Sequence, residues 1–419
     1  MFTRFVLSFL LLTLFSFSGF TQKCDKDFRP LVLIHGFLGG GDNYAPLIRQ
    51  LSAAGYCTNR CFVFDWNTLA RVDQSKALDL FIDSILMISK AQKADMVGHS
   101  AGGGVAYNYL SDSSRAAKIA HYVHIGSSAQ KASAGPGGGI PTLNIYSLSD
   151  KVARSNEIPG ATNLKFSSYD HFEVVSADSV AAGIFSFFNA GRKYKQAKQG
   201  SIPTEFSFEG KVLSLGENLP QPGSKLVLTK VLPDGSLVNQ TKETVAGSNG
   251  SFQFDRVSSR QSYLLTCYPV SGRTVAYFFP RIAPEEKLLY IRTLPTTGLV
   301  ALLIGGLPND SNQTAMVVFS NQRAIINGRD SLWVQGTEMS TPEFASPAKT
   351  AIAWFLYDAN KNGVSDKNLI PSFASAPFMR GVDLMIHSGK NTPVSLLFNG
   401  IELKIPAIPS SDAVVVVVL

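Results

Sequence analysis

Apolar positions follow two different patterns along the chain. Between residues 25 and 190, short continuous apolar runs alternate with segments in which apolar residues recur every three or four positions. The continuous runs are typical of strands buried on both faces, and the wider spacing is typical of helices with one buried face. Strands are expected at 31–34, 62–64, 119–125 and 141–146, and helices at 43–54, 76–90 and 174–189. This alternation predicts an α/β domain, with a mostly parallel sheet and helices on both faces.

Beyond residue 190 the chain changes to short apolar runs separated by turn residues. The polar and basic residues 191–203 predict a linker that ends at Pro203. Turn signals then alternate with strand-like runs, as in all-β domains. Residues 204–294 resemble a transthyretin-like β-sandwich, through the stretch that begins Asn249-Gly250-Ser251-Phe252. Residues 295–419 are expected to form a second all-β segment, with the run 413–419 as a buried closing strand.

Residues 1–20 have the features of a secretory signal peptide. Arg4 precedes an apolar run over 5–17, and small residues follow this run. The run is short for a membrane-spanning helix, so cleavage is favoured over an uncleaved anchor. We therefore expect a secreted protein, either extracellular or periplasmic.

Export would place four cysteines in an oxidising compartment: Cys24, Cys57, Cys61 and Cys267. Cys57 and Cys61 are close enough in sequence to pair across a small loop, and free thiols are the alternative. The sequence does not choose between the connectivities that four cysteines allow.

The charge of the chain argues against one class of partner. The formal net charge is +7, and part of it lies in the predicted linker. The sequence shows no basic patch interleaved with aromatic residues, so we expect no nucleic acid partner. The sequence leaves the oligomeric state open.

One stretch carries a candidate nucleophile. Residues 98–102, Gly98-His99-Ser100-Ala101-Gly102, form a G-x-S-x-G motif between an apolar run and a helical pattern. In this context the motif is typical of a nucleophile elbow, a tight turn that exposes the serine above a sheet and requires small residues on both sides. The helix that follows directs its positive end at the serine. Because the motif also arises by chance in a glycine-rich chain, Ser100 requires partners.

The candidate base is His171. In proteins with this elbow, the acid and then the histidine follow the serine along the chain. His171 lies after Ser100 and directly before the last predicted helix of the domain. The other five histidines are interpreted as structural or too distant: His35, His99, His121, His124 and His387.

The candidate acid is Asp150. It follows a predicted strand and lies between Ser100 and His171. A carboxylate there can accept the imidazole N–H and stabilise the imidazolium that forms during attack. Asp112 and Asp170 compete for the role, but both are interpreted as surface or loop charges.

Attack on an ester creates an oxyanion that needs preorganised N–H donors. Residues 35–41, His-Gly-Phe-Leu-Gly-Gly-Gly, follow the first predicted strand, and their glycines allow the backbone to approach a substrate. Phe37 and Ala101 are therefore the candidate donors of an oxyanion hole. The loop lacks the Gly-Lys-Ser/Thr of a phosphate-binding P-loop, which excludes that interpretation.

Together, His35-Gly36-Phe37, the motif around Ser100, Asp150 and His171 resemble secreted lipases and esterases of the α/β-hydrolase superfamily. The stretch 145–150 resembles the small secreted bacterial lipases. Stretches at 115–121, 139–143 and 376–379 resemble archaeal two-domain lipases with a C-terminal β domain for long-chain lipid.

Two differences from the archaeal lipases change which residue is expected as the acid and remove the expectation of a large lid. Those lipases place the acid at a position that matches Gly126, so Asp150 must serve here, as in the small lipases. They also carry a long lid insertion, whereas about 30 residues separate Trp66 from Val97, room for one helix.

A separate stretch, Asp358-x-Asn360-x-Asn362-Gly363-x-x-Asp366, resembles a calcium loop but lacks the twelfth glutamate. An Asx-rich turn is the favoured alternative, and the chemistry requires no cofactor.

These residues and motifs support one functional hypothesis. The resemblance implies a secreted carboxylic-ester hydrolase that acts on a lipid or other hydrophobic ester and contacts lipid surfaces peripherally. The alternatives are a depolymerase of aliphatic polyesters and a non-catalytic binding protein on the same fold. Because 25–190 holds every candidate catalytic residue, this domain is expected to retain activity on short esters when separated.

Overall fold

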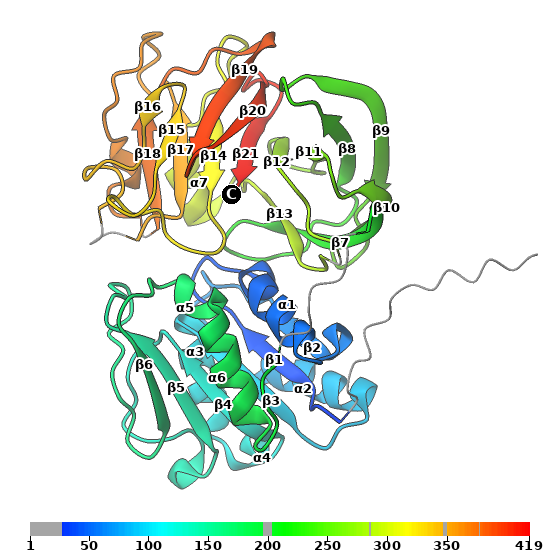
Figure 1. Ribbon diagram of the computed structural model, residues 1–419, viewed down its shortest axis with the longest axis vertical. Coiled ribbons are helices and arrows are strands. Elements are labelled where there is room, and N and C mark those ends of the chain that lie inside the picture. Colours follow the sequence, from blue (N-terminus) through cyan, green and yellow to red (C-terminus); the bar gives the residue numbers. More distant parts are fainter. Residues whose placement is uncertain (1–26, 196–202, 285, 347–349, 377) are drawn as a thin grey trace, which may run out of the picture.

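The computed structural model describes residues 27–195, 203–284, 286–346, 350–376 and 378–419. The predicted signal peptide and Cys24 lie outside these residues, as does part of the predicted linker. In Figure 1 an N-terminal α/β domain lies below a larger domain made mainly of strands.

A six-stranded sheet forms the centre of the N-terminal domain. Its strand order is β2-β1-β3-β4-β5-β6, and all five pairings are parallel. Strand order reverses between β1 and β3, which in open parallel sheets is where ligands bind. The strands are β1 (Leu31–Ile34), β2 (Cys61–Phe64), β3 (Ala94–His99), β4 (Ile119–Ile125), β5 (Thr142–Ser147) and β6 (Thr162–Phe166).

Helices cover both faces of this sheet, as predicted. Alternate residues of β1 explain why: Leu31 and Leu33 pack with α1, α5 and α6, whereas Val32 and Ile34 pack with α2 and α3. The helices are η1 (Gly41–Tyr44), α1 (Ala45–Ala53), η2 (Thr58–Arg60), α2 (Ser75–Ser89), α3 (Ala101–Leu110), α4 (Ser113–Ala116), η3 (Pro136–Gly138), α5 (Glu173–Ser176) and α6 (Asp178–Phe188). No helix in the described residues has both the length and the apolar character needed to cross a membrane.

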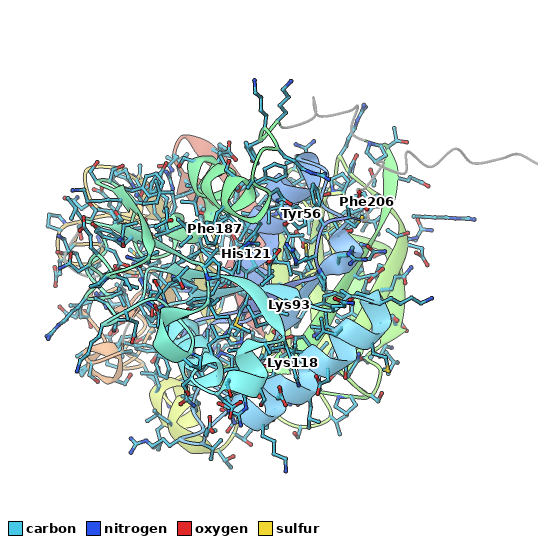
Figure 2. All side chains as sticks on the ribbon, turned by 90° about the horizontal axis from the view of Figure 1, so that it is seen from below. Tyr56, Lys93, Lys118, His121, Phe187 and Phe206 are labelled. Carbon is cyan, nitrogen blue, oxygen red and sulfur yellow. The ribbon has the colours of Figure 1, made fainter. Side chains whose placement is uncertain are left out.

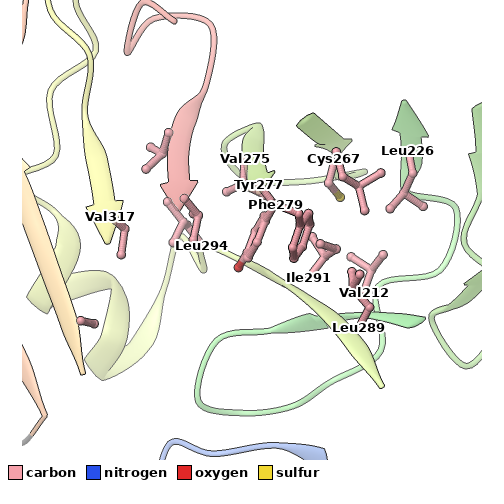
Figure 3. Packing of buried hydrophobic residues seen from close by; sticks show 14 of the residues in the cluster. Val212, Leu226, Cys267, Val275, Tyr277, Phe279, Leu289, Ile291, Leu294 and Val317 are labelled. Carbon is pink, nitrogen blue, oxygen red and sulfur yellow. The ribbon is translucent and has the colours of Figure 1, made fainter. Parts of the chain in front are cut away.

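The described residues from 203 onwards, which we call the β domain, form three sheets in layers. An eight-stranded sheet, in the order β18-β17-β14-β21-β12-β11-β8-β9, packs against a three-stranded sheet on one face and a four-stranded sheet on the other. Figure 3 shows part of the first of these two cores, with side chains from β7, β12 and β13. The elements are β7 (Glu205–Ser214), β8 (Lys225–Val231), β9 (Leu237–Val245), β10 (Ser251–Ser258), β11 (Ser262–Tyr268), β12 (Val275–Phe279), β13 (Leu289–Thr293), α7 (Gly298–Ile304), β14 (Met316–Phe319), β15 (Leu332–Val334), β16 (Thr337–Glu338), β17 (Ala353–Tyr357), η4 (Pro371–Phe373), β18 (Met379–Asp383), β19 (Gly389–Phe398), β20 (Ile401–Ala407) and β21 (Val414–Val418).

The structure differs from the expected division of the β region at residue 295. Strand β21 lies between β12 and β14 and pairs in parallel with both, so it joins strands from 204–294 to strands from 295–419 in one sheet. Val414 and Val416 enter one core, and Val415 and Val417 enter the other. The run 413–419 thus is a buried closing strand, but it closes one shared sheet. The apolar run 298–304 forms the helix α7 rather than a strand.

The suggested disulfide between Cys57 and Cys61 is wrong. Cys57 is disulfide-bonded, whereas Cys61 and Cys267 are free thiols. Burial raises the pKa of both free thiols to about 12, which makes them poor nucleophiles.

Candidate active site

Ser100 lies in a sharp turn between β3 and α3. Its φ of 54° and ψ of −124° are values that a non-glycine residue rarely adopts. Strand and helix nearly touch here: a Cβ on Gly98 would lie 2.8 Å from the carbonyl oxygen of Gly102, and a Cβ on Gly102 would collide with the backbone of Ile34. The packing therefore requires both glycines that the elbow motif predicts.

The structure brings Ser100, His171 and Asp150 into one chain of hydrogen bonds. The Oγ of Ser100 lies 3.0 Å from Nε2 of His171, and Nδ1 of His171 lies 2.8 Å from Oδ2 of Asp150. His171 and Asp150 are buried, and Ser100 is partly exposed. The second carboxylate oxygen of Asp150 accepts the backbone N–H groups of Val152 and Ala153 at 2.8 and 3.1 Å.

These partners keep Asp150 ionised. Burial acts to raise the pKa of the carboxyl, but the hydrogen bond and charge of His171 and the two backbone donors outweigh burial. The pKa of Asp150 therefore lies below its usual range. An anionic Asp150 fixes the imidazole with its proton on Nδ1 and leaves Nε2 free to accept a proton from Ser100.

Gly126, the position that matches the acid of the archaeal lipases in sequence, lies next to the carboxylate of Asp150. Gly126 follows β4, and a Cβ on it would lie 3.3 Å from Oδ2 of Asp150. Position 126 therefore lies beside the carboxylate oxygen that pairs with His171. In this chain the carboxylate comes from the end of β5.

The glycine-rich loop passes close to Ser100. A Cβ on Gly36 would lie only 2.9 Å from Cβ of Ser100, so the backbone of this loop approaches as the sequence predicts. Phe37 lies in the lining of the pocket beside Ser100. Ala101 is the first residue of α3, where backbone N–H groups lack partners within the helix.

The pocket beside Ser100 and His171 is apolar and has walls from both domains. Its empty volume is about 910 Å³, including space open to solvent. Among the described residues that line it, Arg292 alone carries a full charge, and Asp42 pairs with it. Much of the remaining lining belongs to one face of the eight-stranded sheet: Val317, Phe319, Ala353, Phe355, Met379 and Val416.

Comparison with known families agrees with the fold of the N-terminal domain. Residues 29–138 match the model of the alpha/beta hydrolase fold family, and residues 305–419 match a family model described as a C-terminal domain. The N-terminal domain has the α/β-hydrolase fold. Below we call it the hydrolase domain.

Solved structures with similarity to this chain include three hydrolases. An alpha/beta hydrolase from the metagenome of sediments of the Mar Chica lagoon in Morocco is 16% identical over 39% of this chain and 90% of its own, with a TM-score of 0.31. A carboxylesterase of the thaumarchaeon Nitrososphaera gargenis is 15% identical over 39% and 91%, with a TM-score of 0.31. Aspergillus fumigatus lipase B is 16% identical over 42% and 55%, with a TM-score of 0.34.

The β domain contributes an aromatic ring to the site of the hydrolase domain. The ring of Phe378 lies parallel to the imidazole of His171, with the ring centroids 6.0 Å apart, and meets Phe172 edge-on at 5.2 Å. The sequence offered only an indirect signal, because Phe378 falls in the stretch 376–379 that resembles the archaeal lipases.

His99 is a second histidine that the sequence did not assign to the site. Its Nε2 donates to the carbonyl oxygen of His171 at 3.0 Å, and the two rings are 4.7 Å apart. Burial, aided by repulsion from His171, lowers the pKa of His99 to about 3. His99 is therefore neutral at working pH and supports the His171 loop without competing for its proton.

The competing acids and bases lie elsewhere. Asp112 caps α4 by accepting N–H groups of Ser114 and Arg115. His121 pairs with Asp95 at 2.8 Å on the face of the hydrolase domain that is turned away from the β domain, as Figure 2 shows.

Asp170 is structural as well. It accepts the backbone N–H of Glu173 and, from the β domain, the N–H of Ala324 at 3.1 Å and the guanidinium of Arg329 at 3.2 Å. Because Asp170 precedes His171 in the chain, the β domain holds the loop of the candidate base.

The stretch 358–366 forms a turn held by its own hydrogen bonds. Asp358 accepts the backbone N–H of Gly363 at 2.7 Å, and the side-chain amides of Asn360 and Asn362 donate to Asp366 at 2.6 and 2.9 Å. In the described residues, no three His, Cys, Asp or Glu side chains gather in a group that could hold a metal. An Asx-rich turn accounts for these contacts, and calcium here stays a prediction.

Proposed function

We propose that this protein is a secreted serine hydrolase of carboxylic esters with hydrophobic acyl chains. One observation carries the proposal: the hydrogen-bonded chain Ser100–His171–Asp150 opens onto an apolar pocket. The serine supplies a nucleophile, and the pocket supplies a place for a hydrocarbon chain. The predicted signal peptide supports secretion.

The reaction follows from the positions of these groups. Ser100 Oγ attacks the ester carbonyl while His171 takes its proton, and Asp150 stabilises the imidazolium. The N–H groups of Phe37 and Ala101 donate hydrogen bonds to the carbonyl oxygen as negative charge develops on it. His171 then protonates the leaving alcohol. Water attacks the acyl-enzyme with His171 again as the base, which releases the carboxylic acid and frees Ser100.

The pocket favours an acyl ester over the two alternative functions. Residues of both domains line it, and this apolar lining suits the hydrocarbon chain of an acyl ester. A protein that only binds ligands has no need for a polarised serine in a strained turn.

Hydrolysis of p-nitrophenyl esters from acetate to palmitate tests the proposal, with Ser100→Ala as the control. We expect the wild type to hydrolyse these esters with a preference for longer chains, and Ser100→Ala to lose activity with an unchanged thermal melt. No hydrolysis by the wild type at any chain length would contradict the proposal.

A further inference from the structure

The loop proposed to supply one oxyanion donor has a strained backbone. Leu38, directly after Phe37, has a φ of 57°, in the left-handed region that leucine rarely adopts. Such conformations cost roughly 1–3 kcal/mol and persist only when their surroundings hold them. The same loop also approaches Ser100 closely at Gly36, so a small shift would move the N–H of Phe37 relative to the nucleophile.

A buried side chain of the β domain holds this loop. Asn218 follows β7 and is 4% exposed. Its Nδ2 donates to the carbonyl oxygen of Gly39 at 2.9 Å and to that of Trp66 at 3.0 Å, and lies 3.4 Å from Nε2 of His35. One amide thus joins both ends of the loop 35–39 to the segment that follows β2.

A second connection reaches the loop from the same turn. The carbonyl oxygen of Gly216 accepts the hydroxyl of Thr68 at 2.7 Å, and the hydroxyl oxygen of Thr68 accepts the N–H of Leu38 at 3.1 Å. The strained residue next to the candidate donor is therefore tied to the β domain through two hydrogen bonds.

We propose that Asn218 is a positioning residue for the oxyanion hole, so that the β domain takes part in the chemical step as well as in substrate binding. The inference rests on the proposed esterase function. Its physical basis is that an oxyanion donor is effective only when it is already within about 2.7–3.1 Å of the developing charge. Asn218 does not touch the substrate; it acts by fixing the loop that carries the N–H of Phe37.

Two substitutions separate the amide of Asn218 from its backbone. Asn218 has a φ of 54°, which glycine adopts freely and aspartate tolerates. Asn218→Gly removes the amide, and Asn218→Asp keeps its shape but replaces the donor by an acceptor. Both should lower kcat on p-nitrophenyl butyrate by roughly 10–100-fold with little change in KM, because the donors act mainly in the transition state.

A thionoester gives a readout that general damage to the fold would not move. Sulfur is a weaker hydrogen-bond acceptor than oxygen, so an intact oxyanion hole should favour the oxoester over the matched thionoester. In both Asn218 variants this rate ratio should fall towards that of the uncatalysed reaction. The matched control is Glu286→Gln, which removes an ion pair between the domains with Arg49, at 2.8 Å, away from the loop. It should leave kcat and the ratio unchanged.

Thr68→Val covers the case in which the Asn218 variants fail to fold. It removes only the hydroxyl relay to Leu38 and should lower kcat and the rate ratio to a smaller extent. A wild-type kcat and ratio in folded Asn218→Gly, or in Thr68→Val if the Asn218 variants do not fold, would overturn the role of the turn. Absence of esterase activity in the wild type would instead contradict the proposed function.

Discussion

The buried ion pair between Asp42 and Arg292 should contribute far more to stability than an exposed pair between the same domains. The two terminal nitrogens of the Arg292 guanidinium donate to the two carboxylate oxygens of Asp42, at 2.6 and 2.5 Å. The side chains of Arg292 and Asp42 are only 10% and 9% exposed. Asp42→Asn would leave an unpaired positive charge in the wall of the apolar pocket. Breaking such a pair costs about 3–5 kcal/mol, so we expect the melting temperature to fall by roughly 5–15 °C.

The exposed pair of Arg49 and Glu286 is the control. The Arg49 side chain is 42% exposed, so Arg49→Met should cost at most about 1 kcal/mol. The double variant Asp42→Asn/Arg292→Met leaves no unpaired charge and should recover much of the lost stability. Urea unfolding and thermal melts of all four proteins measure these differences. If Asp42→Asn costs no more than Arg49→Met, or if the double variant is as unstable as Asp42→Asn, the reasoning is wrong.

Three further predictions follow from the site. Asp150→Asn should lower kcat by about 10³–10⁴-fold, because the imidazole loses its orienting anion, and a near-normal kcat would show that another group is the acid. Phe378→Gly, which accepts the φ of 68°, should lower kcat/KM for palmitate about tenfold more than for butyrate; equal losses would show that the ring does not contact the acyl chain. Because the pKa of Asp150 is lower in the folded protein, the ionised carboxylate stabilises the fold fully at pH values above the usual aspartate pKa. This stabilisation is lost as the pH falls through the lower pKa of the folded state. The melting temperatures of wild type and Asp150→Asn should therefore converge in strong acid.

The sequence predicts those parts of the fold whose signal is local. β1 is a continuous apolar run because it is buried on both faces, and the alternating valines of β21 fill two cores. β6 escaped prediction because its side chains are mostly exposed and give no apolar run. The segment 298–304 was assigned to β structure because a short apolar run does not distinguish a strand from a helix.

The candidate site shows the same limit. Ser100, His171 and Asp150 could be found because a motif, a chain order and a strand end each mark one of them. Nothing local marks Asn218 or Arg292, whose partners in the hydrolase domain are more than 150 residues away in the chain. The contact with Asn218 changes what we expect of residues 25–190 on their own. Without Asn218 the loop of Phe37 should be poorly positioned, so the separated domain should have low activity even on acetate esters.

The most direct test of the central claim is covalent labelling of the full-length protein with a fluorophosphonate, followed by mass spectrometry of its peptides. We predict one modified residue, Ser100, with labelling abolished in Ser100→Ala and strongly slowed in Asp150→Asn. Label on a different residue, or no label on a protein that still hydrolyses esters, would contradict it.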